Sequence, residues 1–119
     1  MGFVKTGVRV SNPSNPSRYA ELELLVDTGA TFILIPSAIF QEISVEVDAK
    51  FKLRMADGKF IERDGGTVWI EVEGKGYKVP VIVGEGEDVP ILGITTLEIL
   101  GLEVDPITKK LKPTEYLLL

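Results

Sequence analysis

Short runs of alternating apolar and polar residues, separated by turn-forming residues, extend through most of this chain. Residues 3–10, 19–26, 67–73 and 77–83 alternate in this way, and the first two runs are separated by the segment 11–17, which holds three serines, two asparagines and two prolines. A period of two predicts strands that bury one face. The composition of segment 11–17 predicts an exposed loop between the first two strands.

Two further strand-like runs flank the dipeptide Asp57-Gly58. They cover residues 51–56 and 59–63. Asp-Gly readily forms a two-residue hairpin turn because glycine tolerates a positive φ. The segment therefore predicts a projecting β-hairpin with a two-residue turn at its tip.

Helical signals are brief. Pro36 is a plausible first helical residue for a short helix over 37–43. A short buried strand at 90–92 precedes residues 94–100, whose apolar residues share one helical face before Gly101 as a cap. Many short strands with turns about 8 to 12 residues apart, and one or two short helices, predict an all-β closed barrel rather than βαβ units. At 119 residues, we expect a single domain over 1–119.

Composition excludes several classes of chemistry. The chain has 13 basic and 18 acidic residues and no basic cluster longer than Lys109-Lys110, so nucleic acid is not an expected partner. It contains neither cysteine nor histidine, which removes disulfides, thiolate nucleophiles, Ser-His-Asp triads and the usual zinc ligands. Carboxylates are the leading catalytic candidates, and we expect no metal or cofactor.

The chain lacks the apolar segments that membranes and secretion require. Residues 1–5 have no core of signal-peptide length, and no stretch approaches about 18 uninterrupted apolar residues. We therefore expect a cytoplasmic protein with no membrane partner.

One carboxylate stands out by its position. Asp27 follows the apolar run 22–26 and begins the only Asp-Thr-Gly in the chain. Peptide hydrolysis by aspartate needs one ionised carboxylate to deprotonate water and one protonated carboxyl to polarise the carbonyl. Two carboxylates about 3 Å apart cannot both ionise, so they share a proton. A twofold axis beside Asp27 would supply the pair from identical chains.

The order of three motifs resembles a known family. Residues 26–31, the Asp57-Gly58 hairpin and Ile91-Leu92-Gly93 before a helix are similar in order and spacing to a retropepsin-like aspartic protease, across about three quarters of the chain. The longer segment after Gly101 resembles bacterial and archaeal single-domain relatives. The resemblance implies an acid-protease closed barrel and a homodimeric endopeptidase that binds peptide or protein substrates in extended form.

The resemblance also implies roles for individual residues. Asp27 corresponds to the catalytic residue, Thr28 to the residue that hydrogen-bonds across the dimer axis, and Gly29 to the one that admits substrate. The active-site loop then comprises Thr28, Gly29, Ala30 and Thr31; the flap over the substrate comprises Met55, Ala56, Asp57 and Gly58; and the second motif supporting the active site comprises Ile91, Leu92 and Gly93.

Two positions depart from the viral members of that family. Viral enzymes usually carry an Asp four positions after the catalytic Asp and an Arg directly after the later Gly, and the two form an ion pair. Here these positions hold Thr31 and Ile94. Since both charges are absent, no buried charge is left unpaired. Viral dimer contacts therefore cannot be transferred to this chain.

Two other functions fit the same residues. The first is a retropepsin-like fold that serves as a dimerising or peptide-binding module with little or no proteolytic activity, because one barrel can host either function. The second is an unrelated β-barrel binding domain in which Asp27 only caps a turn.

Overall fold

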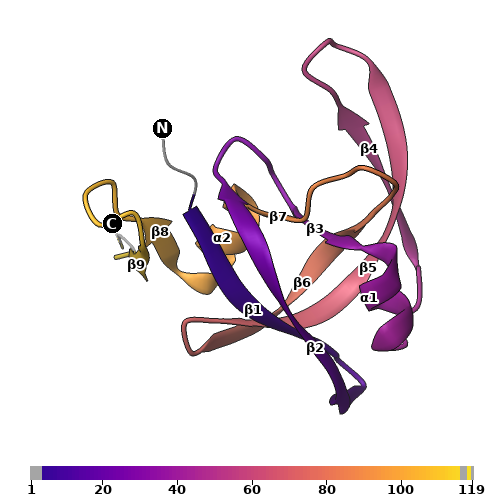
Figure 1. Cartoon of the computed structure of the whole chain (residues 1–119), viewed down its shortest axis with the longest axis horizontal. Helices are drawn as coiled ribbons and strands as arrows, with labels where there is room; N and C mark the ends of the chain where they lie inside the picture. The colour runs from indigo at the N-terminus through magenta and orange to yellow at the C-terminus, as the bar shows by residue number, and fades with distance from the viewer. Residues whose placement is uncertain (1–3, 116–117, 119) are drawn as a thin grey trace.

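A computed structural model describes residues 4–115 and Leu118 of the chain (Figure 1). The described part is mostly β-strand with two short helices, which confirms the all-β prediction. The elements, in chain order, are β1 (Val4–Asn12), β2 (Asn15–Asp27), β3 (Ile33–Pro36), α1 (Ser37–Glu42), β4 (Ala49–Arg54), β5 (Phe60–Val72), β6 (Lys75–Gly84), β7 (Ile91–Gly93), α2 (Ile94–Leu100), β8 (Leu102–Val104) and β9 (Leu111–Pro113).

Seven strands form one sheet whose pairings return to their start. The order is β1-β2-β7-β3-β6-β5-β4, and β1 also pairs with β5, so six of these strands form a ring of pairings. Two pairs, β2–β7 and β3–β6, are parallel, and the other pairs are antiparallel. The remaining strands, β8 and β9, form a separate two-stranded sheet at one side of the molecule (Figure 1).

The core lies inside this ring. Its members are aliphatic apart from Phe40, as period-two burial of Val, Ile and Leu on strands would produce. Fully buried examples on different strands are Val10, Leu24, Ile35, Val68 and Val81. Their burial is the main favourable term that holds the strands together.

The first loop is much shorter than predicted. Strand β1 ends at Asn12 and β2 begins at Asn15, so only residues 13–14 form the turn, and the prediction of a loop over 11–17 was wrong. The pairing beside the turn is irregular, because the register shifts between Ser11 and Asn12. The Asn12 side chain explains the difference. Its Oδ1 accepts the Ser14 N–H at 2.8 Å, and its Nδ2 donates to the Ile43 and Ser44 carbonyls at 3.1 and 2.9 Å. These bonds compress the turn and fasten it to the end of α1.

The β4–β5 hairpin is confirmed, but its turn differs from the prediction. Met55 N–H donates to the Lys59 carbonyl at 2.7 Å, and Gly58 N–H donates to the Met55 carbonyl at 2.9 Å. The loop therefore holds three residues, 56–58, and the expected two-residue turn was wrong. Gly58 has φ +87° while Asp57 keeps a negative φ, and a type I′ turn needs both to be positive.

A single strand, β5, replaces two predicted runs. It continues through Gly65 and Gly66, which are both buried. A Cβ on Gly66 would lie 2.7 Å from the Glu46 carbonyl oxygen, so glycine is what allows the 44–48 segment to pass this close. The glycine pair therefore marks close packing inside a strand rather than a break.

The prediction of a second helix with a glycine cap is confirmed. The second helix covers 94–100 and ends at Gly101, whose φ of +68° is left-handed, as a glycine cap requires.

Among the residues that the structure describes, no helix is long and apolar enough to cross a membrane.

Candidate active site

Asp27 is the last residue of β2 and is exposed to solvent. Its Oδ1 accepts the Gly29 N–H at 2.9 Å, and its carbonyl accepts the Ala30 N–H at 3.1 Å. An aspartate that caps its own turn in this way keeps one oxygen in a fixed direction. Within the described residues, no lysine or arginine forms an ion pair with this carboxylate. The side chain is therefore oriented by backbone and open on its outer side.

The loop that follows Asp27 is held by the second predicted motif and by the first turn of α2, which directly follows that motif. β2 and β7 are parallel, with Asp27 opposite Gly93. The N–H groups of Ile94 and Thr95, in the first turn of α2, donate to the carbonyls of Ala30 and Thr31 at 2.8 and 2.9 Å. The structure thus places 27–31 next to 91–93 and the first turn of α2.

These backbone bonds join two segments at positions that carry no charged side chain. Thr31 and Ile94 carry no side-chain charge, and the main chain joins their segments directly. First-turn N–H groups of a helix have no partner within the helix, so they are free to donate to a neighbouring loop. The loop therefore needs no charged side chain at these two positions to stay against α2.

Gly93 is required by this close approach. A Cβ there would lie 2.5 Å from the Phe32 carbonyl oxygen and 2.7 Å from both the carbonyl carbon and oxygen of Thr31. Its φ is −88°, so the requirement is one of space rather than of backbone conformation. Gly29 is also confined, because a Cβ would lie 3.2 Å from Asp27 Oδ1.

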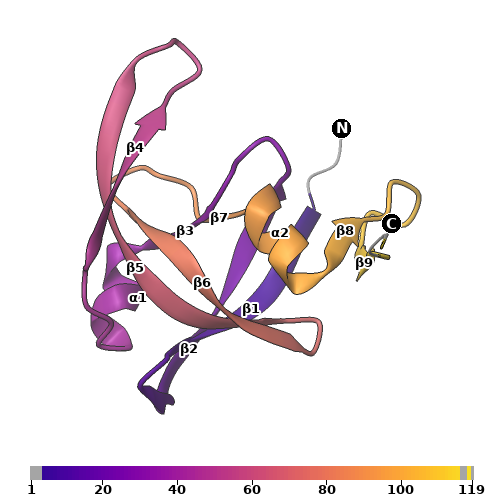
Figure 2. The ribbon, with the colours of Figure 1, turned by 180° about the vertical axis from the view of Figure 1, so that it is seen from behind.

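The β4–β5 hairpin and the Asp27 loop rise from the same side of the molecule (Figures 1 and 2). The predicted flap residues 55–58 form the exposed tip of this hairpin. Contact between the two elements occurs at the root of the hairpin, where the Phe51 and Phe32 rings lie 5.2 Å apart, centroid to centroid, at 55°. Sequence patterns do not reveal this ring contact.

The loop between β6 and β7 is fastened to the hairpin strand β5 by charge. Arg63 Nε lies 3.0 Å from Glu85 Oε2 and 3.2 Å from Asp88 Oδ2. The Glu85 N–H, which donates to Asp88 Oδ2 at 2.9 Å, and then the Arg63 guanidinium hold the pKa of Asp88 below its ordinary value. Two acidic residues of this loop, Glu85 and Asp88, thus form ion pairs with Arg63.

Asp88 is expected to make stability depend on acid pH. Because folding lowers its pKa, its contribution is complete above the ordinary carboxyl range and is lost as pH falls below about 4. Asp88→Asn should be less stable at pH 7 and should show a shallower loss of unfolding free energy between about pH 4 and pH 2. Urea unfolding over a pH series measures this.

The control for that experiment is Glu87→Gln in the same loop, which removes a carboxylate at an exposed position. Its acid profile should follow the wild type. An unchanged profile in Asp88→Asn would contradict the role given to Asp88.

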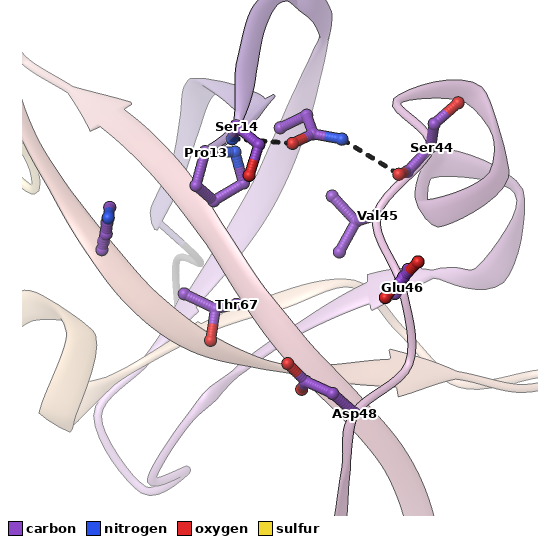
Figure 3. A pocket seen from close by; sticks show the side chains of 9 residues that line it. Pro13, Ser14, Ser44, Val45, Glu46, Asp48 and Thr67 are labelled. Carbon is purple, nitrogen blue, oxygen red and sulfur yellow. Dashed lines mark hydrogen bonds between the residues drawn. The ribbon is translucent and has the colours of Figure 1, made fainter.

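A separate hollow lies at the other end of β2, between the β1–β2 turn and the 44–48 segment (Figure 3). Its volume is about 470 Å³, and its lining includes Ser14, Glu46, Asp48 and Thr67. The dashed lines in Figure 3 are the Asn12 bonds to Ser14 and Ser44. None of the residues of the Asp27 loop lines this hollow, so it is distinct from the candidate active site.

Comparison with known proteins identifies the family of the chain. A family model described as aspartyl protease matches residues 14–104, from the start of β2 to the end of β8. The chain belongs to the aspartyl protease family. A search of curated proteins finds no match. Family membership supports a protease as the class of enzyme, and it removes the alternative of an unrelated β-barrel domain.

Proposed function

We propose that this aspartyl protease family member is a homodimeric endopeptidase with a retropepsin-like closed barrel. The observation that carries the proposal is the exposed Asp27 carboxylate, oriented by backbone hydrogen bonds in a chain with a single Asp-Thr-Gly. One such carboxylate supplies half of the pair that the reaction needs. A second copy related by a twofold axis supplies the other half. The ring of strand pairings supports the barrel.

The proposed reaction uses the two Asp27 side chains in different protonation states. The ionised carboxylate takes a proton from water while the water oxygen attacks the peptide carbonyl carbon, and the protonated carboxyl gives its proton to the carbonyl oxygen. The resulting diol then loses a proton to one carboxylate while the amide nitrogen receives a proton from the other carboxyl group. The C–N bond breaks and releases an amine and a carboxylic acid.

The other predicted residues have supporting roles in this proposal. The β4–β5 hairpin, with its tip at 55–58, closes over the peptide and adds it to the sheet as an extended strand. Thr28 is exposed beside Asp27 and bonds across the dimer axis. The carbonyl of Gly29, with Thr31 beside it, holds the substrate backbone. Each assignment follows the family resemblance and the exposure of these residues at the site.

Two measurements test the proposal together. Sedimentation of the wild type should give a species of twice the 13.0-kDa chain mass. The same sample should cleave members of a broad peptide library, at internal rather than terminal peptide bonds. A monomer that cleaves nothing over the tested concentration and pH range would overturn it. A dimer that cleaves nothing, and that a transition-state-analogue peptide does not protect against thermal unfolding, would favour the peptide-binding module instead.

A further inference from the structure

The Phe32–Phe51 contact joins two elements that the proposed reaction uses. Phe32 directly follows the Asp27 loop, and Phe51 lies on β4, the first strand of the hairpin. Their ring centroids are 5.2 Å apart with a tilt of 55°, within the range that aromatic pairs favour. Phe51 of the hairpin therefore contacts, ring to ring, the residue that directly follows the Asp27 loop.

The β5 strand makes room for this contact. In the β4–β5 register, Gly65 is opposite Ala49. Ala49 is two residues before Phe51 on β4, so Gly65, Ala49 and Phe51 lie on the same face of the hairpin. A Cβ on Gly65 would overlap the Phe51 ring and would also lie 2.7 Å from the Val81 carbonyl oxygen. The ring of Phe51 thus lies over a glycine, which fixes its direction toward Phe32.

Strand β4 has two chemically different faces. Phe51 and Leu53 are half-buried, whereas the alternate residues Lys50, Lys52 and Arg54 are exposed. Lys52 and Arg54 lie over the Phe60 ring at 4.5 and 5.1 Å from its centroid, on the charged face. Since Phe51 contacts Phe32, the apolar face is the one turned toward the Asp27 loop.

The ring contact lies outside the main core. Neither Phe32 nor Phe51 belongs to the buried cluster inside the strand ring or to the residues packed against it, and both side chains are half-buried. Removing the Phe51 ring therefore removes little of the burial that holds the ring of strands together. Its principal effect falls on the position of the hairpin relative to the loop.

We propose that Phe51 is a positioning residue that anchors the root of the flap hairpin to the Asp27 loop, so that closure over a peptide and placement of the carboxylate are coupled. This inference rests on the proposed function for its catalytic consequence. The anchoring itself is a property of one chain and is measurable without substrate.

The experiment compares Phe51→Ala and Phe51→Leu with the matched control Lys50→Ala, an adjacent strand position on the charged face. The chain has no cysteine, so Lys59→Cys next to the hairpin tip gives one site for a nitroxide label in each background. The mobility of the label reports the hairpin, thermal unfolding reports the fold, and peptide cleavage by unlabelled variants reports KM and kcat.

Phe51→Ala should sharpen the label spectrum and lower kcat/KM by roughly 10- to 100-fold, with a rise in KM, because a small displacement of a closing element is costly. Phe51→Leu keeps an apolar contact, so its label mobility and its kcat/KM should both lie between those of Phe51→Ala and the wild type. Lys50→Ala should match the wild type in both. Unchanged mobility in Phe51→Ala, or the same increase in Lys50→Ala, would overturn the anchoring role.

The measurements separate this proposal from the proposed function. If the wild type cleaves no peptide, the label spectra still decide whether Phe51 anchors the hairpin. If Phe51→Ala does not fold, Phe51→Leu and Phe32→Leu provide the same comparison from both sides of the contact. Loss of thermal stability in these variants without any change in label mobility would show a purely structural role and contradict the proposal.

Discussion

Asp27→Asn is expected to reduce peptidase activity by roughly 10³-fold or more, because general acid–base catalysis of this size is lost when neither copy can exchange a proton. The asparagine side-chain oxygen can still accept the Gly29 N–H, so the turn at the end of β2 is preserved. The position is exposed, and the unfolding free energy should change by no more than about 0.5 kcal/mol. Cleavage of a responsive library peptide and thermal unfolding measure the two effects.

The matched control is Asp64→Asn, which neutralises an exposed aspartate on β5 opposite Lys50. It should keep wild-type activity. Full activity in Asp27→Asn would exclude Asp27 as the catalytic carboxylate and, with it, the proposed mechanism. Equal losses in both variants would point to net charge rather than to the site.

Gly93→Ala is expected to have the second-largest effect. The added methyl group would lie within 2.7 Å of backbone atoms of both Thr31 and Phe32, and a backbone cannot yield as a flexible side chain does. Overpacking of this kind costs about 1–3 kcal/mol of unfolding free energy. Relief of the clash must move the loop that carries Asp27, so activity should fall by roughly 100-fold even where the chain still folds.

Gly7→Ala provides a sharp control for this variant. Gly7 lies on β1, and a Cβ there would meet no atom within 4 Å. Its substitution should leave activity unchanged, with stability equal to or slightly above the wild type, because alanine restricts the unfolded chain. Denaturant unfolding and peptide cleavage compare the pair. Wild-type activity in Gly93→Ala would show that the loop tolerates displacement and that the contact with Gly93 does not position Asp27.

Local signals predicted much of this fold. Gly101 was expected to end the second helix, and it takes the left-handed conformation that a glycine cap needs. The first turn was mispredicted because composition was taken to define a loop over 11–17. Asn12 also donates to carbonyls about 30 positions away in the chain, and no local pattern contains those bonds.

The residues of the candidate site were proposed from motifs, whereas the contacts that support them could not be. Asp27 and Gly93 belong to the motifs that carry the family resemblance, and the structure places them opposite each other on parallel strands. No sequence pattern identifies Phe32 and Phe51 as partners, because a ring contact between distant segments produces no periodicity along the chain. The Gly65-Gly66 pair was the available hint, since adjacent glycines within a strand indicate close approach of another group.

The pairing of Asp27 with Gly93 also determines when the carboxylate becomes organised. These residues are 66 positions apart, and the N–H donors that support the loop belong to residues 94 and 95. During synthesis, the aspartate emerges long before its supports, and parallel pairings of such separation form late in folding. A nascent chain therefore carries an unorganised acid until most of the domain has been translated. The supported conformation of the Asp27 loop therefore arises only when residues 93–95 have joined the fold.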